Sequence, residues 1–120
     1  MLFIEYPKCS TCKNAKKYLE EKKIEFIDRD ITKQTPTVEE LTKWISKYQI
    51  DIKRLFNTSG LVYKDLQLKD KLNDMTEEEK IKLLSSNGML IKRPLLISDE
   101  EIKIGFKIKE WDNLLGEDNE

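Results

Sequence analysis

The chain has 120 residues, a length at which one domain can bury a substantial core without disulfides or metal. Its 22 basic and 23 acidic residues nearly cancel, which leaves a net charge of -1. Because such a surface has no overall attraction for polyanions, we expect no direct binding of nucleic acid or of an anionic membrane.

The first residues predict neither a signal peptide nor a membrane span. The longest apolar run there covers residues 1–4, without a basic leader or a small-residue cleavage site. We therefore expect a cytoplasmic protein. In that compartment the two cysteines are not expected to form a disulfide scaffold, and a C-x-x-C pair beside a strand, a helix and a strand is typical of redox-active thiols.

The first quarter of the chain predicts a strand, a helix and a second strand. Residues 2–6 (LFIEY) favour a strand that ends at Pro7. Residues 11–22 are mostly helix formers and place Cys12 on an apolar face, opposite lysines and glutamates that we expect to be solvated. Residues 24–31 alternate apolar and polar side chains, which predicts a second strand parallel to the first.

The middle of the chain predicts helices. Thr37 and Glu40 have the spacing of a capping box, which predicts a helix that begins there, and Thr76 with Glu79 repeats the pattern. Between these two helix starts no strand-like alternation of apolar and polar residues is found. We therefore expect a helical insert at about residues 37–88.

Two breaks are predicted within this insert. Residues 57–60 (NTSG) favour a turn, because their short polar side chains can bond to the local backbone. Asn87 or Gly88 is expected to end the last helix of the insert in the left-handed conformation.

The end of the chain predicts a hairpin and a last helix. Residues 95–98 and 102–106 are β-compatible and are separated by an acidic turn, so we expect antiparallel neighbours. Residues 108–115 predict an amphipathic helix, and residues 116–120 an acidic, frayed tail. The apolar stripe of this helix consists of Ile108, Trp111, Leu114 and Leu115.

The order β-α-β-α-(helical insert)-β-β-α predicts an α/β protein. We expect a thioredoxin-like, glutaredoxin-type mixed β-sheet with an inserted helical lobe, in a single domain at residues 1–115. In open α/β sheets, ligands bind beyond the carboxyl ends of the parallel strands. The chemistry is therefore expected at the tip of the first strand, where Cys9 lies.

The two cysteines differ in their expected surroundings. Cys9 precedes the first turn of a helix, where free N–H groups and the positive end of the dipole favour a thiolate. Lys8 and Lys13 add positive charge nearby. Cys12 lies one turn later on the apolar face, so it should be partly buried and less ionised than Cys9. We expect Cys9 to attack and Cys12 to resolve the mixed disulfide.

Other uses of the cysteines are weaker. A disulfide that closes so short a loop would stabilise the fold by only about 2 kcal/mol. A zinc site lacks ligands, because the chain has two cysteines and no histidine, so no metal is expected. Two cysteines that merely pack remain an alternative. No glycine pattern for a dinucleotide is present, so we expect no cofactor and a thiol reductant, either of low molecular weight or a thioredoxin-like protein.

Three segments resemble the arsenate reductase-like (ArsC/Spx/MgsR) family: YPKCSTCKNAKKYLEE at residues 6–21, FNTSG at residues 56–60 and GMLIKRPLLI at residues 88–97. The similarity runs from Leu2 to about Leu115. It implies a thioredoxin-like fold with an inserted helical lobe, and a nucleophilic cysteine at the position of Cys9.

The resemblance also assigns arginines. In the glutaredoxin-coupled arsenate reductases arginines hold the oxyanion, and the one in the Arg-Pro motif matches Arg93. We expect Arg93 near Cys9, followed by a proline that can take the cis form beside the thiol. Asn57 and Phe106 stand where the family has other arginines, with Arg54 only nearby, so the match favours thiol–disulfide exchange over arsenate reduction.

The alternative hypothesis is that the chain is a regulator of the kind found in this family. Spx-type proteins use C-x-x-C as a redox switch and bind the α subunit of RNA polymerase. They carry a glycine in the loop after the second helix, where this chain has Gln49, Ile50 and Asp51. We therefore rank polymerase binding second.

The predicted site combines these residues. We expect Cys9, Cys12 and Arg93 to be catalytic in a monomer. The residues expected to bind substrate are Ser10, Thr11, Pro94 and Asn57.

Overall fold

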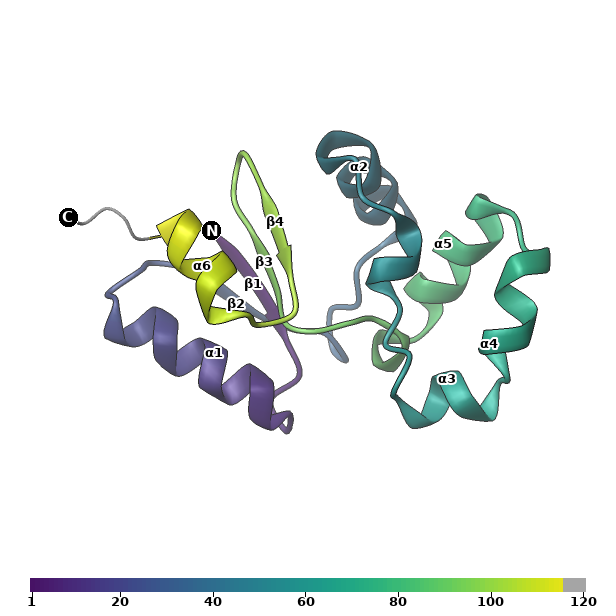
Figure 1. Ribbon diagram of the computed structural model, residues 1–120, viewed down its shortest axis with the longest axis horizontal. Coiled ribbons are helices and arrows are strands. Elements are labelled where there is room, and N and C mark those ends of the chain that lie inside the picture. The colour runs from purple at the N-terminus through teal and green to yellow at the C-terminus, as the bar shows by residue number, and fades with distance from the viewer. Residues whose placement is uncertain (116–120) are drawn as a thin grey trace. The chain divides into compact units, whose positions relative to one another are not determined.

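The structure, a computed structural model, describes residues 1–115 except the side chain of Leu115 (Figure 1). The tail predicted at residues 116–120 lies outside the described part. The strands are β1 (Leu2–Glu5), β2 (Ile27–Asp30), β3 (Leu95–Ile97) and β4 (Ile102–Ile104). The α-helices are α1 (Ser10–Glu21), α2 (Val38–Tyr48), α3 (Leu61–Asp65), α4 (Leu68–Lys71), α5 (Glu77–Ser86) and α6 (Ile108–Leu115). Short 3₁₀ helices cover Ile52–Leu55, Leu72–Asp74 and Gly88–Leu90.

The chain divides into two compact units. The thioredoxin-like unit consists of Met1–Arg29 and the chain from Arg93 onward, and the helical unit is Asp30–Lys92. The order of elements agrees with the predicted β-α-β-α-(helical insert)-β-β-α. The predicted α/β fold class is therefore confirmed.

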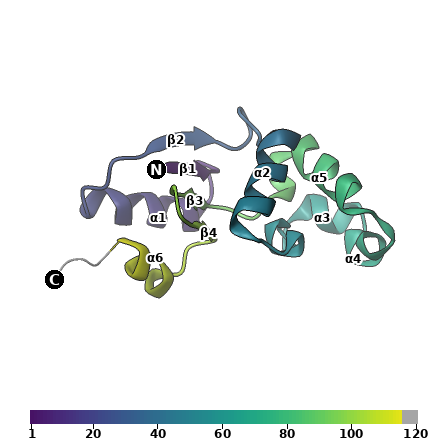
Figure 2. The same cartoon turned by 90° about the horizontal axis from the view of Figure 1, so that it is seen from above.

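The four strands form one mixed sheet in the order β2-β1-β3-β4. β1 and β3 are antiparallel, with Phe3 opposite Leu96, and β3 and β4 form the predicted antiparallel hairpin, with Leu96 opposite Lys103. β1 and β2 run in the same direction (Figure 2), as a helical crossover through α1 requires. The carboxyl end of β1 therefore leads straight into α1.

The second strand is shorter than predicted. It begins at Ile27 rather than at residue 24. The preceding residues serve the end of α1 instead: Lys23 takes the left-handed conformation (φ 58), and the Ile24 N–H donates to the carbonyl of Leu19 at 3.0 Å. Apolar alternation at Ile24 and Phe26 reflects side chains that pack on the core without strand pairing.

Helices α1 and α6 pack on one face of the sheet. The core between them consists of Phe3, Ala15, Leu19, Leu96 and Trp111, all fully buried. The indole N–H of Trp111 donates to the carbonyl of Gly105 at 3.1 Å, so its polar atom is satisfied inside the core. Ile108 was expected on the same stripe, but it is the first residue of α6 and is 56% exposed.

Both predicted capping boxes are present in the helical unit. The Thr37 hydroxyl accepts from the Glu40 N–H at 3.0 Å, and the Thr37 N–H donates to the Glu40 carboxylate at 3.0 Å. Thr76 and Glu79 repeat the pair of bonds at 2.8 and 3.1 Å. Each cap satisfies backbone donors that the helix leaves open and contributes about 1 kcal/mol.

The predicted left-handed end of α5 is wrong. Asn87 is extended (φ -157, ψ 113), and its side chain accepts from the Met89 N–H at 2.8 Å, which begins the following 3₁₀ turn. Gly88 is required for a different reason. A Cβ at this position would lie within 3.0 Å of the carbonyl of Ile31, closer than real side chains come. The glycine therefore permits a close approach of two backbone segments.

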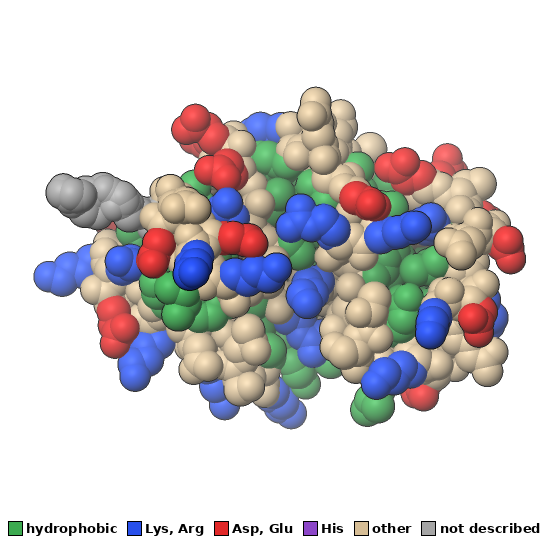
Figure 3. Space-filling model, in the orientation of Figure 1, with side chains coloured by type: hydrophobic (Ala, Val, Ile, Leu, Met, Phe, Trp, Pro, Cys, Tyr) green, Lys and Arg blue, Asp and Glu red, His purple; other side chains and the backbone are tan. Residues whose placement is uncertain are grey.

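The surface carries both signs of charge. Figure 3 shows basic and acidic side chains interspersed on the face that it draws, in line with the small net charge. Within residues 1–115, no helix has the length and apolar character needed to cross a bilayer.

Candidate functional site

The first cysteine lies at the N-cap of α1. After β1 the chain turns at Tyr6 and Pro7, and the Cys9 N–H donates to the Tyr6 carbonyl at 2.9 Å. Cys9 is extended (φ -86, ψ 125), and its sulfur accepts from the Cys12 N–H at 3.4 Å. A cysteine therefore takes the capping role that serine, threonine or aspartate usually takes, with its Sγ among the open donors of the helix.

This position lowers the pKa of the Cys9 thiol. Partial burial acts to raise the pKa, but hydrogen bonds from the Cys12 N–H, the Cys12 thiol and the Thr11 N–H act against it, together with the charge of Arg93. The lowering effects prevail, so Cys9 is more ionised at neutral pH than an ordinary cysteine. Cys9 is also partly exposed, so solvent is not fully excluded from it.

The second cysteine is shifted in the opposite direction. Cys12 is fully buried in the apolar face of α1, and this burial is the main reason why its pKa rises to about 12. The neighbouring Cys9 raises it further, while a hydrogen bond from the Tyr6 N–H at 3.5 Å lowers it in part. Two thiols three positions apart thus hold their protons with very different strength.

Arg93 lies beside this pair. Its charge lowers the pKa of both thiols, which places the guanidinium within electrostatic reach of each sulfur. The guanidinium carbon also lies 5.1 Å from the ring centroid of Tyr6. The Arg93–Pro94 peptide bond is cis, the form that was expected, and the buried Pro94 accepts the Gly105 N–H at 2.8 Å as β3 begins.

Sequence reasoning missed Tyr6 as a member of this group. Tyr6 contacts all three predicted catalytic residues: its carbonyl binds Cys9, its N–H binds the Cys12 sulfur and its ring contacts Arg93. An aromatic residue at the end of the predicted strand, three positions before Cys9, is the signal in the sequence that could have indicated it.

The remaining predicted residues lie in two places. Ser10 and Thr11 form the exposed first turn of α1 beside Cys9, and Pro94 follows Arg93 in the thioredoxin-like unit. Asn57 lies in the helical unit, where its N–H donates to the carbonyl of Leu90 at 2.7 Å and its side chain accepts from the Ser59 hydroxyl. The contacts of Asn57 confirm the predicted turn, and its part in substrate binding stays a prediction.

A half-exposed lysine forms ion pairs with a buried and a partly exposed carboxylate next to the strand that leads into the site. Glu5 ends β1 with only 3% exposure, and the Lys16 ammonium lies 3.8 Å from its carboxylate and 2.7 Å from that of Asp28. The hydrogen bond to Asp28 is the main reason why the pKa of Lys16 is raised. The lysines of α1 were expected to be solvated, but Lys16 joins β1, α1 and the β2 strand through these carboxylates.

The described side chains offer no cluster of ligands for a resident metal ion. Among residues 1–115, no three histidine, cysteine, aspartate or glutamate side chains come together in a way that could hold an ion. What the arrangement offers is thiol chemistry at a helix N-terminus, assisted by one guanidinium.

A cysteine at the N-cap of the helix that follows the first strand, together with a cis-proline just before a neighbouring strand, is typical of a thioredoxin-like protein. Residues 4–114 match the model of the ArsC family, and the chain belongs to that family. It is 46% identical to YusI of Bacillus subtilis (strain 168) over an alignment of 112 residues, and this alignment covers 93% of the chain and 95% of YusI.

Two further comparisons bear on function. The chain is 32% identical to the regulatory protein MgsR of the same organism over an alignment of 106 residues, and this alignment covers 88% of the chain and 82% of MgsR. A crystal structure of an ArsC family related protein from Bacteroides fragilis superposes with a TM-score of 0.89, at 52% identity, over 94% of this chain and 95% of that one. The resemblance predicted from the sequence motifs is confirmed.

Proposed function

We propose that this ArsC-family chain is a thiol–disulfide oxidoreductase in which Cys9 is the nucleophile and Cys12 the resolving cysteine. The observation that carries the proposal is the different placement of the two thiols: Cys9 caps α1 with its sulfur accepting the Cys12 N–H, whereas Cys12 is fully buried. The pKa of Cys9 is accordingly lowered, and that of Cys12 is raised to about 12. A reactive thiolate next to a protonated, buried partner is what a two-cysteine exchange cycle needs.

The cycle has two exchange steps. In the first, the Cys9 thiolate attacks one sulfur of a disulfide R–S–S–R′, forms a Cys9–S–S–R bond and releases R′–S⁻. In the second, Cys12 gives up its proton to solvent and attacks the sulfur of Cys9, which forms the Cys9–Cys12 disulfide and releases R–S⁻. The substrate gains two electrons and the cysteine pair loses two. Two thiols of the reductant then restore the dithiol and leave as a disulfide.

The high pKa of Cys12 is compatible with the second step. Burial is its main cause, but the negative charge of Cys9 contributes. In the mixed disulfide Cys9 carries no charge, so that contribution disappears when Cys12 must ionise. The pKa of Cys12 is therefore lower in the mixed disulfide than in the reduced pair, although burial still raises it.

The residues around the pair support the same chemistry. Arg93 stabilises the thiolate of Cys9 before the first attack and the thiolate of Cys12 during resolution, because its charge lowers the pKa of both thiols. We assign substrate contacts to Ser10, Thr11 and Pro94, which adjoin Cys9 and Arg93 in the chain. The reductant is a thiol, of low molecular weight or on a thioredoxin-like protein, and the working form is a monomer in the cytoplasm.

A disulfide suits this site better than arsenate does. An oxyanion with two negative charges is held best by several bidentate guanidinium groups. Arg93 is the arginine whose charge acts on the thiols. Asn57 and Phe106, which occupy the places of other arginines in the arsenate reductases, have no charge to offer.

The proposal is tested by redox titration of three proteins in glutathione buffers: wild type, Cys9→Ser and Cys12→Ser. Mass spectrometry is expected to show a reversible Cys9–Cys12 disulfide in the wild type and a trapped mixed disulfide on Cys9 in Cys12→Ser. Cys9→Ser should form neither product. Turnover assays are expected to show reduction of a mixed disulfide and little reduction of arsenate. A wild type that never joins its two cysteines would contradict the proposal.

A redox-sensing regulator is the second candidate, favoured by the similarity to MgsR over most of both chains. In that case the same cysteine pair switches a surface that binds the α subunit of RNA polymerase. The loop after α2 argues against it, because the regulators carry a glycine in this loop, whereas this chain has Gln49, Ile50 and Asp51 there. Redox-dependent capture of the purified α subunit, without turnover of any disulfide, would favour the regulator.

A further inference from the structure

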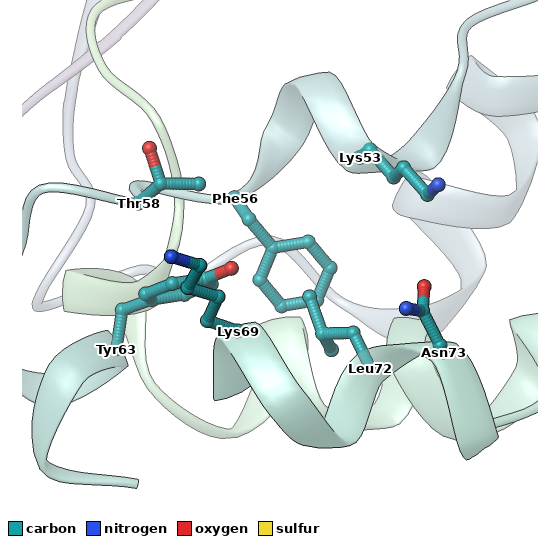
Figure 4. Close-up of a pocket in the computed structure, with 7 residues that line it drawn as sticks. All are labelled: Lys53, Phe56, Thr58, Tyr63, Lys69, Leu72 and Asn73. Atoms are coloured by element: carbon teal, nitrogen blue, oxygen red, sulfur yellow. The ribbon is translucent and has the colours of Figure 1, made fainter. Parts of the chain in front are cut away.

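The helical unit contains a pocket of its own (Figure 4). Its volume is about 220 Å³, below the roughly 300–1,000 Å³ of sites for drug-sized ligands, so it fits a molecule with a single ring. All of its lining residues belong to the helical unit. They are Lys53, Phe56, Thr58, Tyr63, Lys69, Leu72 and Asn73.

The inner part of this pocket is apolar and aromatic. Phe56 and Leu72 are buried, and Tyr63 is partly buried. The rings of Phe56 and Tyr63 meet edge to face, with centroids 6.3 Å apart and an interplanar angle of 60°. Two rings at this angle offer an edge and a face to a third ring, an arrangement that favours an aromatic ligand over an aliphatic one.

The outer part is polar and positively charged. In Figure 4 the Phe56 ring lies between Lys69 with Thr58 on one side and Lys53 with Asn73 on the other. All four of these polar residues are exposed. The lining contains two ammonium groups and no carboxylate, so the pocket selects for negative charge.

The two lysines have no competing acidic partner. Within residues 1–115, Lys53 and Lys69 form no ion pair, whereas Lys16, Lys82 and Lys103 each bind a carboxylate. The nearest acid in sequence to Lys53 is Asp51, and its carboxylate accepts from the Lys53 backbone N–H at 3.0 Å. The ammonium groups are therefore available to an anion from solution.

The wall of the pocket includes part of the FNTSG segment at residues 56–60. Phe56 and Thr58 come from this segment. It is held in place by the Asn57 N–H, which donates to the Leu90 carbonyl, and by the Gly60 N–H, which donates to the Asn57 carbonyl at 3.1 Å. The segment that the thiol chemistry leaves largely unexplained thus shapes a second site.

We propose that this pocket binds a small aromatic carboxylate, with the ring against Phe56 and Tyr63 and the carboxylate toward an ammonium group of Lys53 or Lys69. Thr58 and Asn73 supply further hydrogen-bond donors at the rim. The site belongs to the helical unit and does not depend on the reactivity of Cys9. Its ligand would belong to a chemical class that has no part in the exchange chemistry of the two thiols.

The test is a backbone amide NMR titration of the reduced full chain with sodium benzoate. Benzoate should cause saturable shifts that are centred on the lining residues, with a Kd of about 1–10 mM, as expected for a fragment of this size. Benzamide has the ring without the charge, and acetate has the charge without the ring. Each should bind at least about tenfold more weakly than benzoate, since benzamide lacks the charge that attracts the lysines and acetate lacks the ring that packs against Phe56 and Tyr63.

Matched variants complete the test. In the double variant Lys53→Gln/Lys69→Gln, the affinity for benzoate should fall at least about threefold, because the ammonium groups attract the carboxylate. Lys43→Gln removes an exposed lysine of α2 that does not line the pocket, and it should leave the affinity unchanged. Shifts that do not saturate, that benzamide reproduces at equal strength, or that persist unchanged in the double variant would overturn the proposal. The rate of Cys9 alkylation should be the same with and without benzoate.

Discussion

The guanidinium of Arg93 lies over the ring of Tyr6, with its central carbon 5.1 Å from the ring centroid. The backbone of the same tyrosine binds the sulfur of Cys12 and the N–H of Cys9. Tyr6, directly after β1, therefore contacts both the cation and the turn that carries the thiols. A cation over an aromatic face gains about 0.5–1 kcal/mol at an exposed site and more when it is partly desolvated.

Replacing Tyr6 tests whether its ring positions Arg93. Tyr6→Leu removes the ring and keeps the backbone bonds, so we expect alkylation of Cys9 by iodoacetamide at pH 7 to slow about twofold. Tyr6→Phe keeps the ring and should react like wild type. In an Arg93→Met background, Tyr6→Leu should have no further effect, because the ring then has no cation to hold. Equal slowing in both backgrounds would show that the ring acts by another route.

Arg93 itself should act mainly through its charge. Arg93→Met removes a charge that lowers the pKa of Cys9, so the fraction of thiolate at pH 7 should fall and iodoacetamide alkylation should slow about two- to fivefold. Arg93→Lys keeps the charge and should recover most of that rate. With iodoacetate, an anionic reagent, the loss in Arg93→Met should be larger. An unchanged rate with both reagents would contradict the assignment.

Two glycines of the helical unit offer a contrast in stability. A Cβ on Gly88 meets the backbone carbonyl of Ile31, which cannot move aside, so Gly88→Ala should lower the free energy of unfolding by about 1–3 kcal/mol. A Cβ on Gly60 lies 2.6 Å from the side-chain amide of Asn57, which can rotate away, so Gly60→Ala should lose less. Chemical denaturation of both variants measures the difference. A Gly60→Ala loss as large as that of Gly88→Ala would contradict the role given to Ile31.

The ion pair of Lys16 should matter more than a surface pair. Lys16→Met leaves the buried carboxylate of Glu5 with less compensation, and we expect a loss of about 1–3 kcal/mol in the free energy of unfolding. Lys82→Met breaks an exposed pair with Glu78 at 3.2 Å and should lose less than about 0.5 kcal/mol. Thermal and urea unfolding at neutral pH compare the two. Equal losses would indicate that burial of Glu5 does not depend on Lys16.

Local patterns in the sequence were enough for much of the fold. The capping boxes at Thr37 and Thr76 were predictable because their bonds join residues three apart, and the hairpin after Pro94 was predictable from a short acidic turn. The end of α5 was not predictable in this way. Gly88 is needed because of Ile31, a residue far away in the sequence, and no local pattern reveals such an approach.

In the candidate site too, features set by local sequence patterns were predictable, and contacts between residues far apart in the sequence were not. The N-cap position of Cys9 and the burial of Cys12 follow from helix periodicity around a C-x-x-C pair, and both were predicted. The contact of Tyr6 with Arg93 joins β1 to the start of β3, and sequence spacing contains no information about it. The ion pairs of Lys16 were missed for a related reason, since an exposed helical lysine and a paired one look alike in sequence.

The most direct test of the account is the pH dependence of Cys9 alkylation in the reduced protein, followed by mass spectrometry at each cysteine. Because the pKa of Cys9 is lowered, its thiolate should persist at lower pH, and the rate should reach half its plateau below the value of about 8.5 of an ordinary cysteine. Cys12, with a pKa of about 12, should stay unlabelled throughout. A midpoint for Cys9 at or above that of an ordinary cysteine, or labelling of Cys12 as fast as that of Cys9, would contradict the account.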